Sequence, residues 1–499
     1  MPTTALSVVP ATAGIIQDER LNLVAVYAPS YATDKFATWS SSDPKVATVN
    51  ALGQVTGVAA GKAVITATVR EGGPTSACTV NVKAVPGTGV IAVRAGTFLD
   101  SIGANTAISN RGETLTKTIE CVKYLGLRWI RSGVGLPAQD YVDLHKATGV
   151  RFSLGFGGDI NRFLLGARRI AEGKLLIAFE GPNEPNNWGL IYQDVKGGGS
   201  DSWIPVAKLQ RDFYAAVKGD PALRAFPVWH LTEGGAEVDN VGTQFLAIPK
   251  GANIAMPEGT QYADAACVHN YCTHPGWGGL HDNQTWVASD PLSTCRVDGL
   301  YVEYGKTWGK KYDGYSEEQL KTLPRVTTET GATIEGPITE EIQARLYLGI
   351  YLAQFKRGWS HTAMYILRDR VDEGGNQTFG FYRPDYQPRK AATYLHNLTT
   401  ILADSGYIAL PGRLDYFIAN QPEAVHELLL QKSNGRFSLV VWGEKYISGG
   451  TETVTVKLGK TFKTVTLYDA TLGTTPVQTL ENVDAVQVTV GTNPVIIEL

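Results

Sequence analysis

The sequence predicts a multidomain chain with an N-terminal all-β sandwich, a central (β/α)8 (TIM) barrel and a C-terminal β-sandwich. Residues 3–84 and 406–499 alternate apolar and polar positions between Gly-rich turns, which is typical of half-buried strands. Between them, strand-like apolar segments alternate with stretches of helical periodicity. This alternation favours a parallel sheet, and eight such repeats favour a closed barrel. The expected divisions are 1–84 for the first sandwich, 85–96 for a linker with one sandwich strand, 97–405 for the barrel and 406–499 for the second sandwich.

Most of the expected barrel strands end in a polar or aromatic side chain. Barrels of this kind carry their chemistry at the C-terminal ends of the strands, so we expect these side chains to form the site. The strands are expected at 97–99, 127–131, 151–156, 175–179, 226–231, 265–271, 325–329 and 362–367, and helices at 114–125, 204–217, 340–356 and 388–403. The residues at the strand ends are Asp100, Arg131, Glu184, His230, His269, Tyr271, Glu329 and Arg368.

The fourth expected strand runs into the most informative stretch of the chain. An apolar segment, Leu175–Phe179, is followed after Gly-Pro by Asn183, Glu184 and Pro185. Pro185 removes a backbone donor and stiffens the turn. The pattern predicts an acid held at a strand end, beside an amide that can hydrogen-bond a hydroxyl group. Glycoside hydrolysis needs such a carboxyl group, paired with a second one across the sugar. The alternative is an ordinary turn with a solvated glutamate.

The second carboxylate is expected at Glu329. The segment that contains it is rich in β-branched residues and breaks at Gly331, as a short buried strand would. Because a strand–helix repeat takes roughly 30 residues before insertions, Glu184 and Glu329 fall on strands 4 and 7. Glu329 could instead be a surface acid of a Thr-rich strand. The acids that would then replace it are Glu303, Glu335 and Glu180, although Glu180 is one position out of register and is expected to point elsewhere.

These residues give positions 90–405 a resemblance to the retaining glycoside hydrolases of clan A. The resemblance rests on the Asn183-Glu184-Pro185 triplet, on Glu329, and on His269 and Tyr271 in strand 6. With the extra C-terminal β-sandwich, the chain is most similar to family 39, and families 30, 51 and 79 are close. The resemblance implies a carbohydrate substrate, with Glu184 as the acid/base, Glu329 as the nucleophile and Asn183 as the contact to the sugar 2-hydroxyl.

A double displacement requires different resting states for the two acids. Glu329 must be ionised, and the expected donors around it are His269, Tyr271 and Arg131. Glu184 must carry a proton at rest, which burial and the negative charge of Glu329 would favour. Two of these residues also have a structural interpretation: Arg131 as a salt bridge that ties the end of the barrel, and His269 as a buried structural histidine.

Tryptophans and histidines in the loops suggest further contacts. Trp188, Trp203 and Trp277 are candidate platforms for sugar rings, because an aromatic face is flat and apolar; each could equally pack a loop onto the barrel. His274 and His281 match no strong ligand spacing, so we predict no metal and no cofactor.

The N-terminal module has a recognisable motif of its own. Trp39 with the segment that follows it to Val49, then Gly53, Gly57 and Gly61, resembles the bacterial immunoglobulin-like group 2 domain. The resemblance implies an extracellular or cell-surface setting and a spacer or docking role, with association to a cell surface or cell wall. A Pro- and Gly-containing linker follows, and Val90–Val93 is expected to join the C-terminal sheet.

Composition narrows the setting and the function class. The net charge of −3 argues against nucleic-acid binding, and no apolar run reaches the roughly 20 residues of a membrane helix. The start shows no signal peptide; we expect one to have been removed, with the protein secreted, periplasmic or at the cell surface. A Cys272–Cys295 bridge would fit that compartment.

Two other functions use the same fold. A carbohydrate-binding protein would keep the aromatic loops with misaligned glutamates, and a transglycosylase would use the same acids. An aldolase would need a lysine at a strand end, and none of the eight strands offers one.

Overall fold

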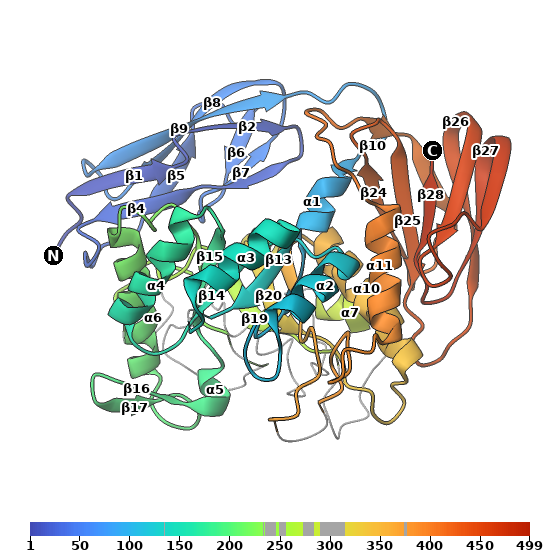
Figure 1. The fold of residues 1–499 in the computed structure, drawn as a ribbon. Helices are drawn as coiled ribbons and strands as arrows, with labels where there is room; N and C mark the ends of the chain where they lie inside the picture. Colours follow the sequence, from blue (N-terminus) through green and yellow to red (C-terminus); the bar gives the residue numbers. More distant parts are fainter. Residues whose placement is uncertain are drawn as a thin grey trace.

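The computed structural model describes residues 1–133, 135–232, 234, 246–248, 256–272, 284–289, 315–373 and 377–499. Three β-rich parts follow one another along the chain: a sandwich, a parallel barrel with helices around it, and a C-terminal sheet. The sandwich covers one end of the barrel, and the C-terminal sheet lies against its side (Figure 1).

The barrel is an eight-stranded parallel sheet in which the first strand pairs with the last and the fifth and sixth strands are the two edges. In the described part of the chain, a single isolated parallel bridge between Trp229 and Ala265 joins these edges, so the barrel is nearly closed. The strands are β12 (Ile102–Asn105), β13 (Trp129–Ser132), β14 (Arg151–Phe156), β15 (Leu176–Pro182), β18 (Val228–Trp229), β19 (Ala266–His269), β20 (Arg325–Thr330) and β21 (Trp359–Met364).

The first strand lies later than the sequence predicted. Residues 97–99 belong to a short helix, α1 (Ala95–Asp100), and the strand is β12, one turn further on. Phe98 and Leu99 are buried in either case, and a short apolar run does not by itself distinguish a strand from a buried helix. Asp100, which was expected at the end of the first strand, therefore ends a helix near the start of β12. Asn105 occupies the end of that strand instead.

The helices surround the barrel. The four expected helices are present as α2 (Leu115–Leu125), α6 (Ile204–Gly219), α10 (Glu340–Lys356) and α11 (Lys390–Ile401), and α3 (Ala138–Thr148) and α4 (Ile160–Glu172) add to them. Side chains of Thr114 and Asp159 cap α2 and α4, and Gly126 ends α2 in the left-handed conformation that suits glycine. Shorter elements are α5 (Pro185–Trp188), β16 (Leu190–Tyr192), β17 (Val195–Gly197), α7 (Gln284–Ala288) and α9 (Glu317–Thr322).

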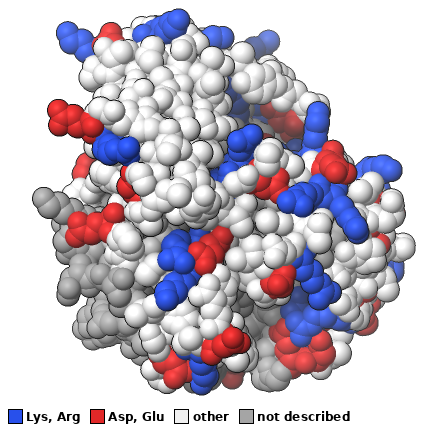
Figure 2. All heavy atoms as spheres, turned by 90° about the vertical axis from the view of Figure 1, so that its left-hand side faces the viewer, with Lys and Arg blue, Asp and Glu red and all other residues white. Residues whose placement is uncertain are grey.

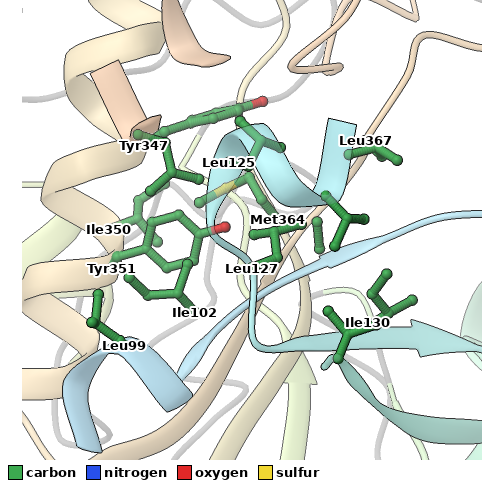
Figure 3. Packing of buried hydrophobic residues seen from close by; sticks show 14 of the residues in the cluster. Leu99, Ile102, Leu125, Leu127, Ile130, Tyr347, Ile350, Tyr351, Met364 and Leu367 are labelled. Carbon is green, nitrogen blue, oxygen red and sulfur yellow. The ribbon is translucent and has the colours of Figure 1, made fainter. Parts of the chain in front are cut away.

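One apolar core joins the barrel wall to its helices. Figure 3 shows Ile102 of β12, Leu125 of α2 and Met364 of β21 packed beside Tyr351 of α10. The Tyr351 hydroxyl donates to the Gly103 carbonyl at 2.7 Å, so the buried phenol is satisfied and α10 is tied to the first strand.

The N-terminal sandwich packs on the barrel end that bears the strand N-termini. Asn50 donates to the Thr322 hydroxyl just before β20, and a Cβ built on Gly219 at the end of α6 would lie 2.9 Å from Ser30 Oγ, so the two parts are close there. The strands are β1 (Ala5–Val9), β2 (Thr12–Ile16), β3 (Arg20–Asn22), β4 (Val24–Ala28), β5 (Thr38–Ser41), β6 (Ala47–Val49), β7 (Gln54–Gly57), β8 (Gly61–Thr68) and β9 (Thr75–Lys83). The opposite end of the barrel, where the strands finish, is left uncovered by this module (Figure 1).

The C-terminal part is a seven-stranded sheet. Of the residues expected to join it, Val93 pairs in parallel with Leu430 of this sheet, whereas Val90 pairs with Leu414 in a separate two-stranded sheet. The last strand is paired on both sides, as expected. The strands are β10 (Val90–Ile91), β11 (Val93–Arg94), β22 (Arg413–Leu414), β23 (Tyr416–Ala419), β24 (Val425–Gln431), β25 (Phe437–Gly443), β26 (Glu452–Asp469), β27 (Gln478–Val490) and β28 (Val495–Glu498); β10 and β22 form a separate pair.

On the face shown in Figure 2, basic and acidic side chains are intermixed between uncharged areas. Among the helices that the structure describes, none is long and apolar enough for a membrane crossing.

A buried acid predicts how stability depends on pH. Burial raises the pKa of Glu444 from 4.5 to about 7 at the contact between α7 and the C-terminal sheet, although Thr285, Trp442 and Trp286 donate hydrogen bonds to it. The folded state therefore binds this proton more tightly than the unfolded state. The free energy of unfolding should fall as pH rises from about 4.5 to about 7, by up to about 3 kcal/mol.

Urea unfolding at several pH values measures this dependence, with Glu444→Gln as the comparison. The amide does not titrate, so the variant should lose this part of the pH dependence. Equal pH dependence in both proteins would contradict the assignment.

Candidate active site

Four side chains from four strands meet at the C-terminal end of the barrel. Glu184 follows β15, Glu329 is on β20, His269 ends β19 and Arg131 is on β13. Parallel strands end at the same rim of a barrel, which brings residues far apart in the sequence into one group.

The two glutamates lie side by side. One carboxylate oxygen of each, together with a ring nitrogen of His269, falls within 4.8 Å of the others. His269 Nδ1 lies 2.6 Å from Glu184 Oε1 and 3.4 Å from Glu329 Oε2. The nearest oxygens of the two carboxylates are therefore at most 4.8 Å apart, which is below the roughly 6.5–9.5 Å that separates the carboxyl groups of inverting glycosidases.

The turn after β15 holds Glu184 in an unusual backbone conformation. Its φ of 41° is in the left-handed region, and it occupies the cap position of α5, with Pro185 next. Its N–H donates to the Thr232 carbonyl at 2.8 Å, and Asn187 donates to its Oε2 at 3.0 Å. Strained residues of this kind concentrate at functional sites, because neighbouring contacts must hold them.

The electrostatic environment of Glu184 differs from the prediction. Burial acts to raise the pKa of this carboxyl group, but the hydrogen bond and charge of His269, aided by Asn187 and Arg131, hold the pKa below its usual value. The expectation that burial and Glu329 would keep Glu184 protonated was therefore wrong, because it left out an imidazole in direct contact.

Donors surround Glu329. The Arg131 guanidinium forms an ion pair with its Oε1, and the Tyr271 hydroxyl donates to its Oε2 at 2.9 Å. Burial and then the charges of Glu329 and Glu184 raise the pKa of Tyr271 well above its ordinary value, so it stays a phenol that donates. The three predicted donors to Glu329, including His269, thus all lie against it.

Glu180 was expected to point elsewhere, and this was wrong. Its side chain is fully buried and accepts from Arg131 Nε at 2.8 Å, from Arg131 Nη2 at 2.6 Å and from Thr328 Oγ1 at 3.1 Å. Ala178, two residues earlier, lies in the cluster that fills the barrel interior, so simple alternation along β15 also turns Glu180 inward. The sequence did contain a signal for this pairing: Glu180 is an acid within an apolar strand, and a buried charge needs a partner.

The remaining predicted contacts differ in their environments. Asn183 is exposed, and its Oδ1 accepts from Arg131 Nη2 at 2.7 Å. Trp188 ends α5 with 77% of its surface exposed, whereas Trp203 is buried and donates to the Gly199 carbonyl. Trp277 lies outside the described residues, as does Cys295, so the platform and the Cys272–Cys295 bridge stay predictions.

A cavity of about 450 Å³ opens beside Glu329. Several residues in its wall could not be predicted from the sequence, because no motif marks the strand ends that carry them. Asn105 is buried there, and its side-chain amide has no hydrogen-bond partner among the described residues. The wall includes Asn105, Thr106, Arg111, Arg131, Ser132, Phe156, Asn183, Glu329, Tyr365 and Arg370.

The other arginines of this wall are already paired. Arg111 and Arg370 each contact Glu373 at 2.6 Å, and Arg111 also contacts Asp372 at 2.8 Å. The Tyr365 hydroxyl donates to Glu373 at 2.5 Å. The wall is therefore polar, with its charges matched.

Within the described part of the chain, a single group of side chains has metal-ligand geometry: Glu184, His269 and Glu329. Arg131 already supplies a positive charge to Glu329, and His269 is hydrogen-bonded to Glu184. The donor set fits paired-carboxyl chemistry better than a cation site, because a divalent ion would compete with that guanidinium.

Comparison with known proteins identifies the N-terminal module. Residues 2–80 match the family model of the bacterial Ig-like domain (group 2), which confirms the expected resemblance. An Ig-like virion protein of Serratia phage KSP90 is 41% identical over 81 residues, which cover 16% of this chain and 31% of that protein. An alpha-L-arabinofuranosidase of Bifidobacterium longum subsp. longum is 46% identical over 69 residues, or 14% of this chain and 6% of that protein. The chain thus spans less than a third of either relative.

Several solved structures of glycoside hydrolases are similar to this chain at low identity. A family 39 glycoside hydrolase of Bacteroides cellulosilyticus WH2 has a TM-score of 0.48 and 14% identity, over 97% of this chain and 98% of that one. A family 39 enzyme of Xanthomonas axonopodis pv. citri has a TM-score of 0.47 and 13% identity, over 82% and 95%. A family 51 arabinofuranosidase of the same organism has 0.46 and 13%, over 82% and 97%.

Close packing behind the Glu184 turn yields a prediction. A Cβ on Gly181 would lie 2.0 Å from Gln210 Oε1 and 2.8 Å from the Leu231 nitrogen, so only glycine fits there. Gly181→Ala should cost about 1–3 kcal/mol of stability and displace the turn that holds Glu184. Urea unfolding measures the loss.

Gly155→Ala on the adjacent strand β14 is the control, because its Cβ would make an ordinary contact of 3.6 Å with the Ser132 carbonyl. Equal stability of the Gly181 and Gly155 variants would contradict the packing argument.

Proposed function

We propose that this protein is a retaining glycoside hydrolase that cleaves O-glycosidic bonds of an oligosaccharide or polysaccharide by double displacement. The observation that carries the proposal is the pair Glu184 and Glu329, with carboxylate oxygens within 4.8 Å at the rim of the barrel. A cavity of about 450 Å³ beside Glu329 offers space for a sugar.

In the first step, a Glu329 oxygen attacks the anomeric carbon. The bond between the anomeric carbon and the leaving-group oxygen breaks, and that oxygen receives the proton shared by Glu184 and His269. Arg131 and Tyr271 favour the ionised form of Glu329 before attack, since both donate to its oxygens.

In the second step, water replaces the leaving group. Once Glu329 is bound to the sugar its negative charge is gone, and Glu184 as a carboxylate accepts a proton from the attacking water. The new bond forms at the anomeric carbon as the ester to Glu329 breaks. Two displacements at one carbon give net retention.

Other residues have supporting roles in this proposal. Asn183 is exposed next to Arg131 and is placed to contact the sugar 2-hydroxyl. The unpartnered amide of Asn105 offers donors and an acceptor to further hydroxyls. Exposed Trp188 suits a stacking platform at the edge of the site. We place the enzyme outside the cytoplasm, with residues 1–84 as a spacer or docking module.

The alternative of an inactive carbohydrate-binding barrel required misaligned glutamates. The short contacts of both acids with His269 favour catalysis over that alternative. A transglycosylase would use the same pair and differ only in the acceptor that replaces water.

Removal of either acid tests the proposal. Glu329→Gln should abolish turnover, because the amide cannot form the glycosyl ester. Glu184→Ala should lower kcat by about 10²–10⁴-fold on substrates with poor leaving groups, the usual contribution of general acid–base catalysis. A screen of aryl glycosides and polysaccharides measures the rates.

Glu335→Gln serves as the control, since Glu335 is an exposed acid shortly after β20 and should be dispensable. Proton NMR of the first product reports its configuration: retention is expected. An inverted product, or full activity of Glu329→Gln, would contradict the proposal.

A further inference from the structure

We propose that Thr328 and Glu180 are positioning residues: they fix the tautomer of His269, so that His269 and Glu184 together store the proton that the leaving group receives. This rests on the proposed glycosidase function and explains how an acid with a lowered pKa could still deliver a proton.

A continuous set of buried contacts connects these residues. Thr328 Oγ1 lies 3.1 Å from Glu180 Oε1 and 3.2 Å from His269 Nε2. On the other side of the ring, His269 Nδ1 lies 2.6 Å from Glu184 Oε1. Thr328, Glu180 and His269 are all fully buried, so solvent does not offer replacement partners.

The direction of each hydrogen bond follows from counting protons. Glu180 accepts two bonds from the Arg131 guanidinium and, as a carboxylate, can only accept. Thr328 therefore donates its single hydroxyl hydrogen to Glu180. Only lone pairs of Thr328 remain for His269, so Nε2 must carry a hydrogen and donate it.

The same hydroxyl has one further neighbour, which does not change this count. Cys267 Sγ lies 3.3 Å from Thr328 Oγ1. Burial raises the pKa of Cys267 well above its ordinary value, so it is a thiol that brings its own hydrogen. Both neighbours then donate to Thr328.

With Nε2 protonated, the contact between Nδ1 and Glu184 holds one transferable proton. The proton is either on Glu184 beside a neutral imidazole or on Nδ1 of an imidazolium beside a carboxylate. In both cases its departure leaves a neutral imidazole and a carboxylate. If the neutral ring instead carried its only hydrogen on Nδ1, departure of that hydrogen would leave an imidazolate, which is far too basic to form here.

Other titratable groups face this pair, and their effects differ: the positive charge of Arg131 favours the carboxylate form of Glu184, whereas a negative charge favours the stored proton. These groups are Glu329, Arg131, Glu180, Tyr271, Tyr365 and Cys267. Ionised Glu329, with an oxygen 3.4 Å from Nδ1, favours the stored proton before attack. That charge disappears when the sugar is attached, which favours the proton-free pair needed as a base in the second step.

The test compares substrates that need an acid with substrates that do not. The probes are phenyl and 2,4-dinitrophenyl glycosides of the sugar that the wild-type enzyme hydrolyses, because dinitrophenolate departs without protonation. Thr328→Val should lower kcat/KM for the phenyl glycoside by about 10–100-fold, a part of the usual contribution of general acid catalysis. The loss for the dinitrophenyl glycoside should be below about threefold, and the alkaline limb of the pH profile should move to lower pH.

Two variants separate this role from a structural one. Thr328→Ser keeps the hydroxyl and should restore the wild-type ratio of the two substrates. Thr330→Val removes another buried hydroxyl of β20, one that donates to the Asn270 carbonyl at 2.9 Å, and should leave the ratio unchanged. Equal losses on both substrates in Thr328→Val, or an unchanged ratio, would overturn the inference.

A second measurement does not depend on activity. ¹⁵N NMR of histidine-labelled protein, with His269→Asn to assign the signal, should show a hydrogen on Nε2 of His269. A neutral ring with its hydrogen on Nδ1 would overturn the inference even in an active enzyme. If the wild-type protein hydrolysed none of the glycosides tested but carried a hydrogen on Nε2 of His269, only the proposed function would be contradicted.

Discussion

The candidate site depends on one largely buried cation, Arg131, whose side chain is 13% exposed and lies between two carboxylates from different strands. Burial acts to lower the pKa of its guanidinium, but Glu180 and Glu329 raise it above the ordinary value, so the charge is kept. The ion pairs join β13 to β15 and β20 across the barrel. A buried arginine is tolerated only with such partners, and the same partners orient the acid assigned as the nucleophile.

The barrel interior below this polar group is filled and uncharged. Trp129 and Trp229 meet edge to face with their ring centres 5.9 Å apart, and His361 packs against both. Burial lowers the pKa of His361 to about 4, so it is neutral at ordinary pH. The aromatic packing lowers the local dielectric constant beneath the carboxylates, which strengthens their interactions with Arg131 and His269.

The sequence was sufficient where a strand end carried a distinct break. Gly-Pro before Glu184 and Gly after Glu329 marked both acids, and the parallel barrel then placed them together. It was insufficient where the outcome depended on a distant partner or on length. Glu180 is buried because Arg131 pairs with it, and the short run Thr97–Leu99 forms a helix. Asn105 and Tyr365 enter the cavity wall through tertiary packing, which no local pattern records.

The position of the N-terminal module constrains what it can do for catalysis. It contacts the barrel through Asn50 near Thr322, before β20 begins, and lies close to it through Ser30 at the end of α6. Both contacts are at the end of the barrel where the strands begin, whereas Glu184 and Glu329 lie where the strands finish. Among the described residues, these contacts of the module therefore lie at the end of the barrel opposite to the two acids. Such contacts can affect catalysis through the stability of the barrel, since they do not adjoin the carboxylates.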